Sequence, residues 1–154
     1  MNWSEGSLGR VFVVRLEEGE VFNDTVETFA RERGVDRGMV FLLGGADAGS
    51  RVVVGPAVES RSAASAATAI TPLLHSLAAP HETLAVGTLF PGPDGQPTLH
   101  MHAAAGREGG ATVGCTRAGM VTWLVAEVVI LEIMGTNAAR RVDPATGFEL
   151  LQAG

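Results

Sequence analysis

Short apolar runs rich in β-branched residues, each bounded by glycine or proline turns, dominate this chain and limit the folds open to it. Runs of this kind are typical of β-strands. We expect about eight or nine strands, at 10–16, 39–43, 51–54 and 83–90, around His100, around Cys115, over 120–134 as one strand or two, and at 148–151. Most of the connections are short, which favours an antiparallel sheet over repeated strand–helix–strand units.

Only one segment has clear helical periodicity. Asn23 or Asp24 is the expected N-cap, and Glu27 follows Asp24 by three residues, as in a capping box. Gly34 can end the helix. Its apolar residues recur at helical spacing at Val26, Phe29 and Ala30. We therefore predict a single α/β domain over 1–154, more narrowly of the α+β type, with one main helix packed against the sheet.

Composition excludes several classes of function. All 11 basic residues are arginine and there is no tyrosine, which removes lysine Schiff-base and tyrosine acid–base chemistry. With 17 acidic residues the net charge is −6, which argues against direct binding to DNA. One cysteine cannot form an internal disulfide, and neither a secretory signal nor a membrane-spanning apolar stretch is present. We therefore expect a cytoplasmic protein with no membrane partner.

Three side chains form a candidate metal site. His100 and His102 are two residues apart in a predicted strand, so both imidazoles point to the same face. The glycine-rich segment 106–110 can reverse the chain and place Cys115 on the neighbouring antiparallel strand. Two imidazoles and a thiolate suit zinc or a similar divalent transition metal with an open fourth position. The alternative is a polar seam in the sheet beside a small buried thiol.

Other candidates carry two interpretations each. Glu82, just before a strand, is a weak candidate for a catalytic acid–base group, or else an exposed carboxylate. Glu127 interrupts the most apolar run, and because a buried carboxylate needs a partner, it should pair with an arginine or lie in an oligomer interface. Arg51 and Arg117 either recognise an anionic ligand or are solvated. His81 is a turn residue or an additional metal ligand.

Some patterns concern packing and assembly. The nearly continuous hydrophobicity of 10–16 predicts a strand buried on both faces, and Gly44–Gly45 predicts a sharp bend or close backbone packing. The segment 57–71 is either a weak helix or a surface excursion. A mean hydropathy of +0.24, with few charges after Met120, indicates a buried interface between copies of the chain.

Several motifs together resemble one known family, the plants-and-prokaryotes conserved (PPC) domain, in its short stand-alone prokaryotic form. They are Gly-Arg-Val-Phe-Val-Val-Arg-Leu from Gly9, Gly-Gly-Ala from Gly44, Asp94-Gly95 leading to His100-Met-His102, Gly-Cys-x3-Gly-x-Val from Gly114, Ala126-Glu127-Val128 and Asp143-x-x-Thr-Gly147. The resemblance covers about 10–151. It implies a highly curved antiparallel sheet with a helix against it, assembled as a homotrimer, and a fold similar to that of acetolactate decarboxylase.

The resemblance also bears on the site and the partners. Acetolactate decarboxylase holds zinc through a His-x-His pair and a third histidine, and His100 and His102 match the family's His-x-His. Cys115 stands where the family usually has the histidine of Gly-Gly-His-Leu. Prokaryotic members have been labelled predicted DNA-binding proteins, but the AT-hook of the plant proteins is missing here. Three hypotheses follow: a metal-binding domain for a small molecule such as an organic acid, a metal-dependent lyase or hydrolase, and a regulatory module that reaches DNA through partners.

Overall fold

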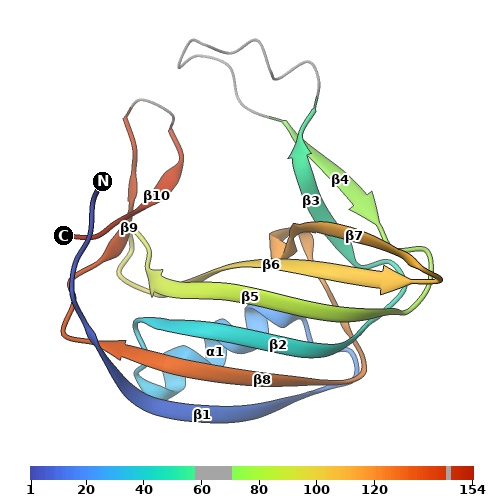
Figure 1. Cartoon of the computed structure of the whole chain (residues 1–154), viewed down its shortest axis with the longest axis horizontal. Coiled ribbons are helices and arrows are strands. Elements are labelled where there is room, and N and C mark those ends of the chain that lie inside the picture. The colour runs from blue at the N-terminus through green and yellow to red at the C-terminus, as the bar shows by residue number, and fades with distance from the viewer. Residues whose placement is uncertain (58–70, 145–146) are drawn as a thin grey trace.

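The computed structural model describes residues 1–57, 71–144 and 147–154, and an eight-stranded antiparallel sheet dominates it (Figure 1). The strand order is β1-β8-β2-β5-β6-β7-β3-β4, and β9 and β10 form a separate pair. The elements are β1 (Ser7–Glu17), α1 (Phe22–Arg33), β2 (Gly38–Ala46), β3 (Arg51–Pro56), β4 (Pro72–Ser76), β5 (His81–Pro91), β6 (Pro97–Arg107), β7 (Gly110–Cys115), the 3₁₀ turn η2 (Thr116–Ala118), β8 (Thr122–Met134), β9 (Ala139–Val142) and β10 (Glu149–Gln152).

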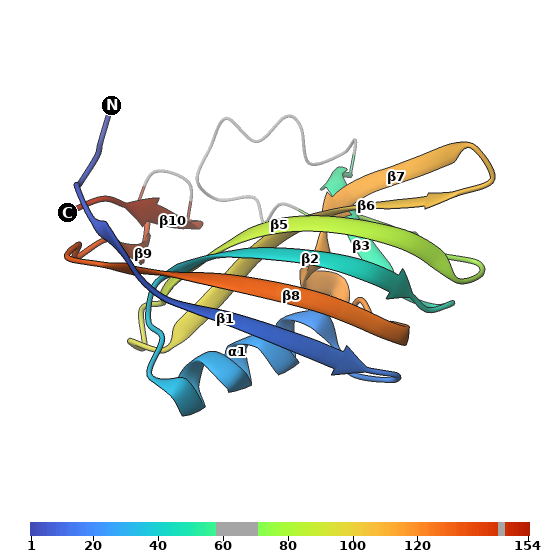
Figure 2. The ribbon, with the colours of Figure 1, turned by 60° about the horizontal axis from the view of Figure 1, so that its bottom comes forward.

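The sheet is strongly curved and α1 packs against one of its faces (Figure 2). Alternate residues of the long strands point toward the helix, because successive side chains of a strand lie on opposite faces. The core side chains contributed by the helix and the strands include Phe22, Val26, Ala30, Val40, Leu42, Met101, Val128 and Ile130. The predicted fold class, an antiparallel sheet with one main helix, is confirmed.

The other face of the sheet, here called the open face, carries exposed apolar side chains. They project from β1, β2 and β5 and are Val11, Val13, Phe41, Leu43, Leu84 and Val86. Val13 is 81% exposed, so the prediction that β1 is buried on both faces is wrong for the described chain. The reason is geometric: α1 covers only one face, and within the described residues no other element covers these positions.

The helix begins differently from its prediction. Its N-cap is Val21, whose side chain makes no capping bond, so the expected capping by Asn23 or Asp24 is wrong. Asn23 and Glu27 instead point toward β6, as described below. The end is as predicted, because Gly34 adopts the left-handed conformation (φ 62°) and its N–H reaches the last carbonyls of the helix.

The paired glycines of β2 allow close backbone packing, as predicted. Gly44 has φ 153°, and a Cβ there would lie 2.5 Å from Ala126 Cα. The β2–β8 register shifts at this point, although β8 remains one strand. The prediction for 57–71 falls mainly on 58–70, outside the described residues, and the sequence patterns did not indicate β4 or β9. Across the described ranges, no helix has the length and apolarity to cross a membrane.

Candidate metal centre

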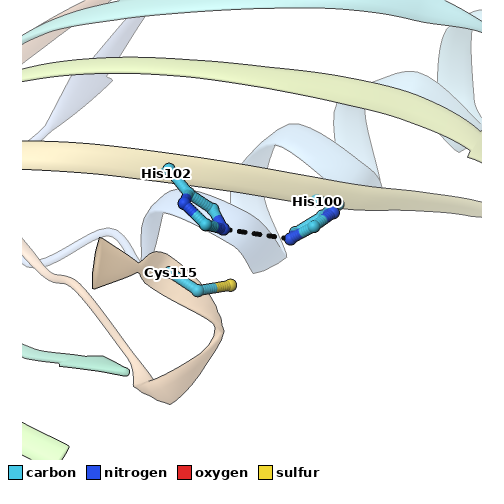
Figure 3. A group of neighbouring side chains, drawn as sticks. All are labelled: His100, His102 and Cys115. Carbon is cyan, nitrogen blue, oxygen red and sulfur yellow. Dashed lines mark hydrogen bonds between the residues drawn. The ribbon is translucent and has the colours of Figure 1, made fainter. Parts of the chain in front are cut away.

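The two histidines lie on the open face of β6, as the alternation of the strand requires. Leu99 and Met101 on either side of His100 are buried toward α1, whereas both imidazoles are exposed on the opposite face. The two Nε2 atoms lie 3.1 Å apart and face each other (Figure 3). At this distance a neutral pair can share one proton, and a cation between the rings would use both lone pairs.

Cys115 joins the histidines through the β6–β7 hairpin. Glu108 and Gly109 both have positive φ (54° and 81°), so the turn reverses the chain tightly. The register places Cys115 directly opposite His102, and the thiol is 4% exposed. The ligand atoms of His100, His102 and Cys115 all lie within 4.8 Å of one another. The hairpin and the convergence of the three side chains thus follow the sequence prediction.

The spacing of the donors can be compared with that of a tetrahedral zinc site. Zn–N and Zn–S bonds of ordinary length separate neighbouring ligand atoms by roughly 3.3–3.6 Å. The Nε2 atoms of His100 and His102 are close to this separation at 3.1 Å. Cys115 Sγ lies within 4.8 Å of both, a gap that small side-chain rotations can close. The three residues therefore fit a zinc ion.

Electrostatics favour the neutral form of His100. Although the residue is exposed, partial desolvation of its ring is the largest cause that lowers its pKa, and the positive charge of Arg140 adds to the effect, followed by His102 and Arg117. Neutral imidazole is the form that binds metal ions. The surroundings of His100 therefore keep it ready for coordination at neutral pH.

A partly buried polar network ties the site to the start of α1. Asn23 Nδ2 donates to Leu99 O (3.2 Å), and Leu99 N–H donates to Glu27 Oε1 (2.8 Å). The Thr116 hydroxyl, next to Cys115, donates to Asn23 Oδ1 (2.6 Å) and contacts Met101 O (3.1 Å). Side chains of the helix thus fix the position of β6 relative to the end of β7.

Two cavities open beside the three donor residues. The first, here called the apolar cavity, has a volume of about 610 Å³ and includes His102 in its wall. The second, the polar cavity, has a volume of about 690 Å³ and includes His100. Cys115, Arg117 and Phe148 line both, so the cavities meet at the candidate site. Arg51 lines neither of them.

The sequence of this chain matches one family model. The Plants and Prokaryotes Conserved (PCC) domain matches residues 3–134, which is most of the chain. The chain belongs to this family. The resemblance stated from the motifs is thereby confirmed, since the PCC domain is the PPC domain under another abbreviation. No curated protein matches the chain.

Solved structures support the PCC fold. A PPC protein from Pyrococcus horikoshii is 23% identical with a TM-score of 0.80, covering 100% of this chain and 99% of its own. A metal-containing protein from Archaeoglobus fulgidus is 21% identical, also with a TM-score of 0.80, and the match covers 97% of this chain and 98% of that protein. A Bacteroides thetaiotaomicron protein, named as a candidate DNA-binding protein, is 15% identical with a TM-score of 0.73. The match covers 96% of this chain and 97% of that protein. At these identities the likeness establishes the fold alone.

Arg140 is a residue of the polar cavity that sequence reasoning missed. It lies on β9, beyond the part matched by the PCC family, and is 6% exposed. Its Nη2 donates to Thr88 O (3.1 Å) and Thr88 Oγ1 (2.9 Å), and Thr88 lies opposite His100 in the β5–β6 register. Burial lowers the pKa of Arg140. No sequence pattern distinguished this arginine from Arg141.

The structure does not bring Glu82 to the three donors. Glu82 lies opposite Gly106, six residues along β5 from Thr88, the partner of His100. At about 3.3 Å per residue this separation is roughly 20 Å. His81 is also removed from the site, and its Nδ1 lies 2.7 Å from Ala79 O in the preceding turn.

Glu127 forms no ion pair with an arginine among the described residues. It is exposed on the open face, opposite Arg15, and Arg15 forms its ion pair with Glu17 instead. The predicted arginine partner is therefore not found for Glu127 within the described residues, and its place in an oligomer interface stays a prediction. The buried carboxylate of β8 is Glu132, whose partner is Arg10.

Proposed function

We propose that this PCC domain binds zinc, or a similar divalent transition metal, through His100, His102 and Cys115 and presents it to a small organic molecule. One observation supports this proposal above all: three soft donors lie within 4.8 Å of one another where two cavities meet. Side chains of this kind at this spacing are those that zinc prefers. The solved relative from Archaeoglobus fulgidus, described as metal-containing, is consistent with the proposal.

The arrangement leaves room for a ligand at the metal. Three protein donors leave one tetrahedral position, and the cavities give a small molecule access to it. When bound there, zinc would supply Lewis-acid polarisation of a ligand oxygen or an activated water. This access favours a second candidate function, a metal-dependent lyase or hydrolase.

Metal analysis of protein purified without chelators tests the proposal. We expect near-stoichiometric zinc in the natural chain and strong loss of zinc in His100→Ala. His75→Ala is the matched control, because His75 is exposed on β4 and lies outside the group of three donors. Equal metal content in His100→Ala and the natural chain would end the proposal. Hydrolase or lyase turnover that chelation abolishes would support the second candidate.

We also propose that the protein assembles as a homotrimer through its open face. Contiguous exposed apolar surface on a sheet is typical of a protein interface, and closed symmetry covers such surface in identical copies. The test is Phe41→Glu, which introduces a negative charge on the open face, with Leu73→Glu on β4 as a control of similar exposure. Light scattering after gel filtration should show a trimer for the natural chain and the control, and a smaller species for Phe41→Glu. A monomeric natural chain would contradict the assembly.

The proposal also includes the location of the protein and its relation to DNA. We place the protein in the cytoplasm, and we expect any association with DNA to run through partner proteins, because the net charge of −6 disfavours contact with phosphates.

A further inference from the structure

The guanidinium of Arg140 is incompletely satisfied. Its Nη2 is fixed by the two oxygens of Thr88, but within the described residues its buried Nε has no hydrogen-bond partner. Within the described residues no carboxylate forms an ion pair with it, although the charge of Glu149 acts on it from a longer distance and raises its pKa. A buried cation with a free N–H is unfavourable on its own, and a guanidinium is suited to bind a carboxylate.

Arg140 lines the same cavity as two of the three donors, His100 and Cys115. Its anchor Thr88 lies directly opposite His100, and both His100 and Arg140 line the polar cavity. The charge of Arg140 acts on the pKa of His100, and Cys115 acts on that of Arg140, so the three groups share one environment. An anion held by Arg140 would therefore lie beside the candidate metal.

The charges of the polar cavity limit the kind of anion. Asp24, Glu27 and Glu149 also line this cavity, and their negative charges disfavour a multiply charged anion such as phosphate. A single carboxylate can be balanced by Arg140 and the metal. On the other side of the site, the apolar cavity offers Val53, Val54, Pro56, Pro72, Val113 and Phe148 to a hydrophobic substituent.

We propose that the ligand of this site is an organic acid with one carboxylate, held by Arg140, and an apolar substituent held by the apolar cavity. An oxygen on the carbon next to the carboxylate would take the open position of the metal, so this inference rests on the proposed function. Arg140 is the binding residue for the anion, and Thr88 is its positioning residue.

The natural chain tests the ligand class with four probes. Mandelate carries a carboxylate, a neighbouring hydroxyl and a phenyl ring, methyl mandelate lacks the charge, glycolate lacks the ring, and inorganic phosphate carries more charge. Calorimetric titration of zinc-loaded protein should rank mandelate first. Glycolate should bind at least about tenfold more weakly, because it leaves the apolar cavity unfilled. Methyl mandelate or phosphate binding as well as mandelate would overturn the inference.

Variants test the role of Arg140. Arg140→Met should weaken mandelate by roughly 10- to 100-fold, since a hydrogen bond to a charged group is lost, and should leave methyl mandelate unchanged. Arg141→Met is the matched control, because Arg141 is its exposed neighbour and lines neither cavity. Thr88→Val retains the charge of Arg140 and a side chain of similar shape at position 88, but removes one of the oxygens that orient Arg140. It provides a second test, with an expected few-fold loss of mandelate affinity, should Arg140→Met fail to fold.

Zinc content separates the two proposals. If Arg140→Met retains zinc and binds mandelate as tightly as the natural chain, the binding role of Arg140, and with it the inference, is overturned, while the metal site stands. If the natural chain takes up no zinc, the proposed function fails and the inference fails with it. Loss of mandelate binding on removal of zinc, together with mandelate ranking first among the four probes, supports both the metal site and the ligand class.

Discussion

The Glu132–Arg10 pair should control much of the acid sensitivity of the fold. Glu132 is 7% exposed and receives Arg10 Nη2 (2.6 Å), Arg10 Nε (2.8 Å) and the Arg10 backbone N–H (2.9 Å). The same guanidinium also donates to the carbonyls of Arg33 and Gly34 (both 3.2 Å), at the end of α1. The pair thus links β1, β8 and the helix.

The size of the effect follows from the pKa of Glu132. The side-chain hydrogen bond from Arg10, followed by the backbone hydrogen bond from Arg10, lowers this pKa from 4.5 to about 2. At about 1.4 kcal/mol per unit the shift corresponds to an upper bound of roughly 3 kcal/mol. Arg10 is half exposed, so solvent screens the pair, and we expect about 1–2 kcal/mol of stability from it.

The pH window follows from the direction of the shift. Because the folded-state pKa of Glu132 is depressed, its contribution is fully present above about 4.5 and is lost as the pH falls toward about 2. Glu132→Gln should therefore lower the free energy of unfolding by about 1–2 kcal/mol at pH 7. The difference from the natural chain should vanish near pH 2.

Urea unfolding monitored by circular dichroism, at one protein concentration across this pH range, measures the effect. Glu82→Gln is the control, because Glu82 is an exposed carboxylate on β5 and should show no comparable loss. An unchanged stability of Glu132→Gln at pH 7, or a deficit that persists undiminished below pH 2, would refute the reasoning.

Three further results are expected. Gly44→Ala should destabilise the fold by roughly 2–4 kcal/mol in urea unfolding, because its Cβ would collide with the backbone of β8, whereas Gly110→Ala should be nearly neutral, since its Cβ would meet one atom at 3.8 Å. Thr116→Val should cost about 1–3 kcal/mol and weaken zinc binding in a competition titration, because it leaves Asn23 Oδ1 without its donor. The isolated protein should show no salt-sensitive retention of duplex DNA in a mobility-shift assay, and tight retention would contradict the charge argument.

The sequence predicted those parts of the fold that depend on local pattern. Alternation and helical spacing located the main strands and α1, and the His-x-His spacing together with the glycine turn brought Cys115 to the histidines. Both features are local, since a strand determines which face each of its residues occupies and a tight turn determines which strand pairs with it.

What the sequence could not show depends on long-range contacts. Asn23 and Glu27 have the residue types of a helix cap, but their better partner is the Leu99 backbone, about seventy residues away. Arg140 is one of two adjacent arginines, and only the docking of β9 against β5 determines which of them is buried. Likewise, hydrophobicity alone could not say that one face of β1 lacks a covering element in the chain.

The β6–β7 turn sets a strict limit on how this domain can change. The pleat alternates at every residue, so a single insertion or deletion at Glu108–Gly109 would shift the pairing of the two strands by one and turn the thiol of Cys115 toward α1. Among descendants of this sequence, then, the length of this one hairpin should be inherited more faithfully than the residues that form it.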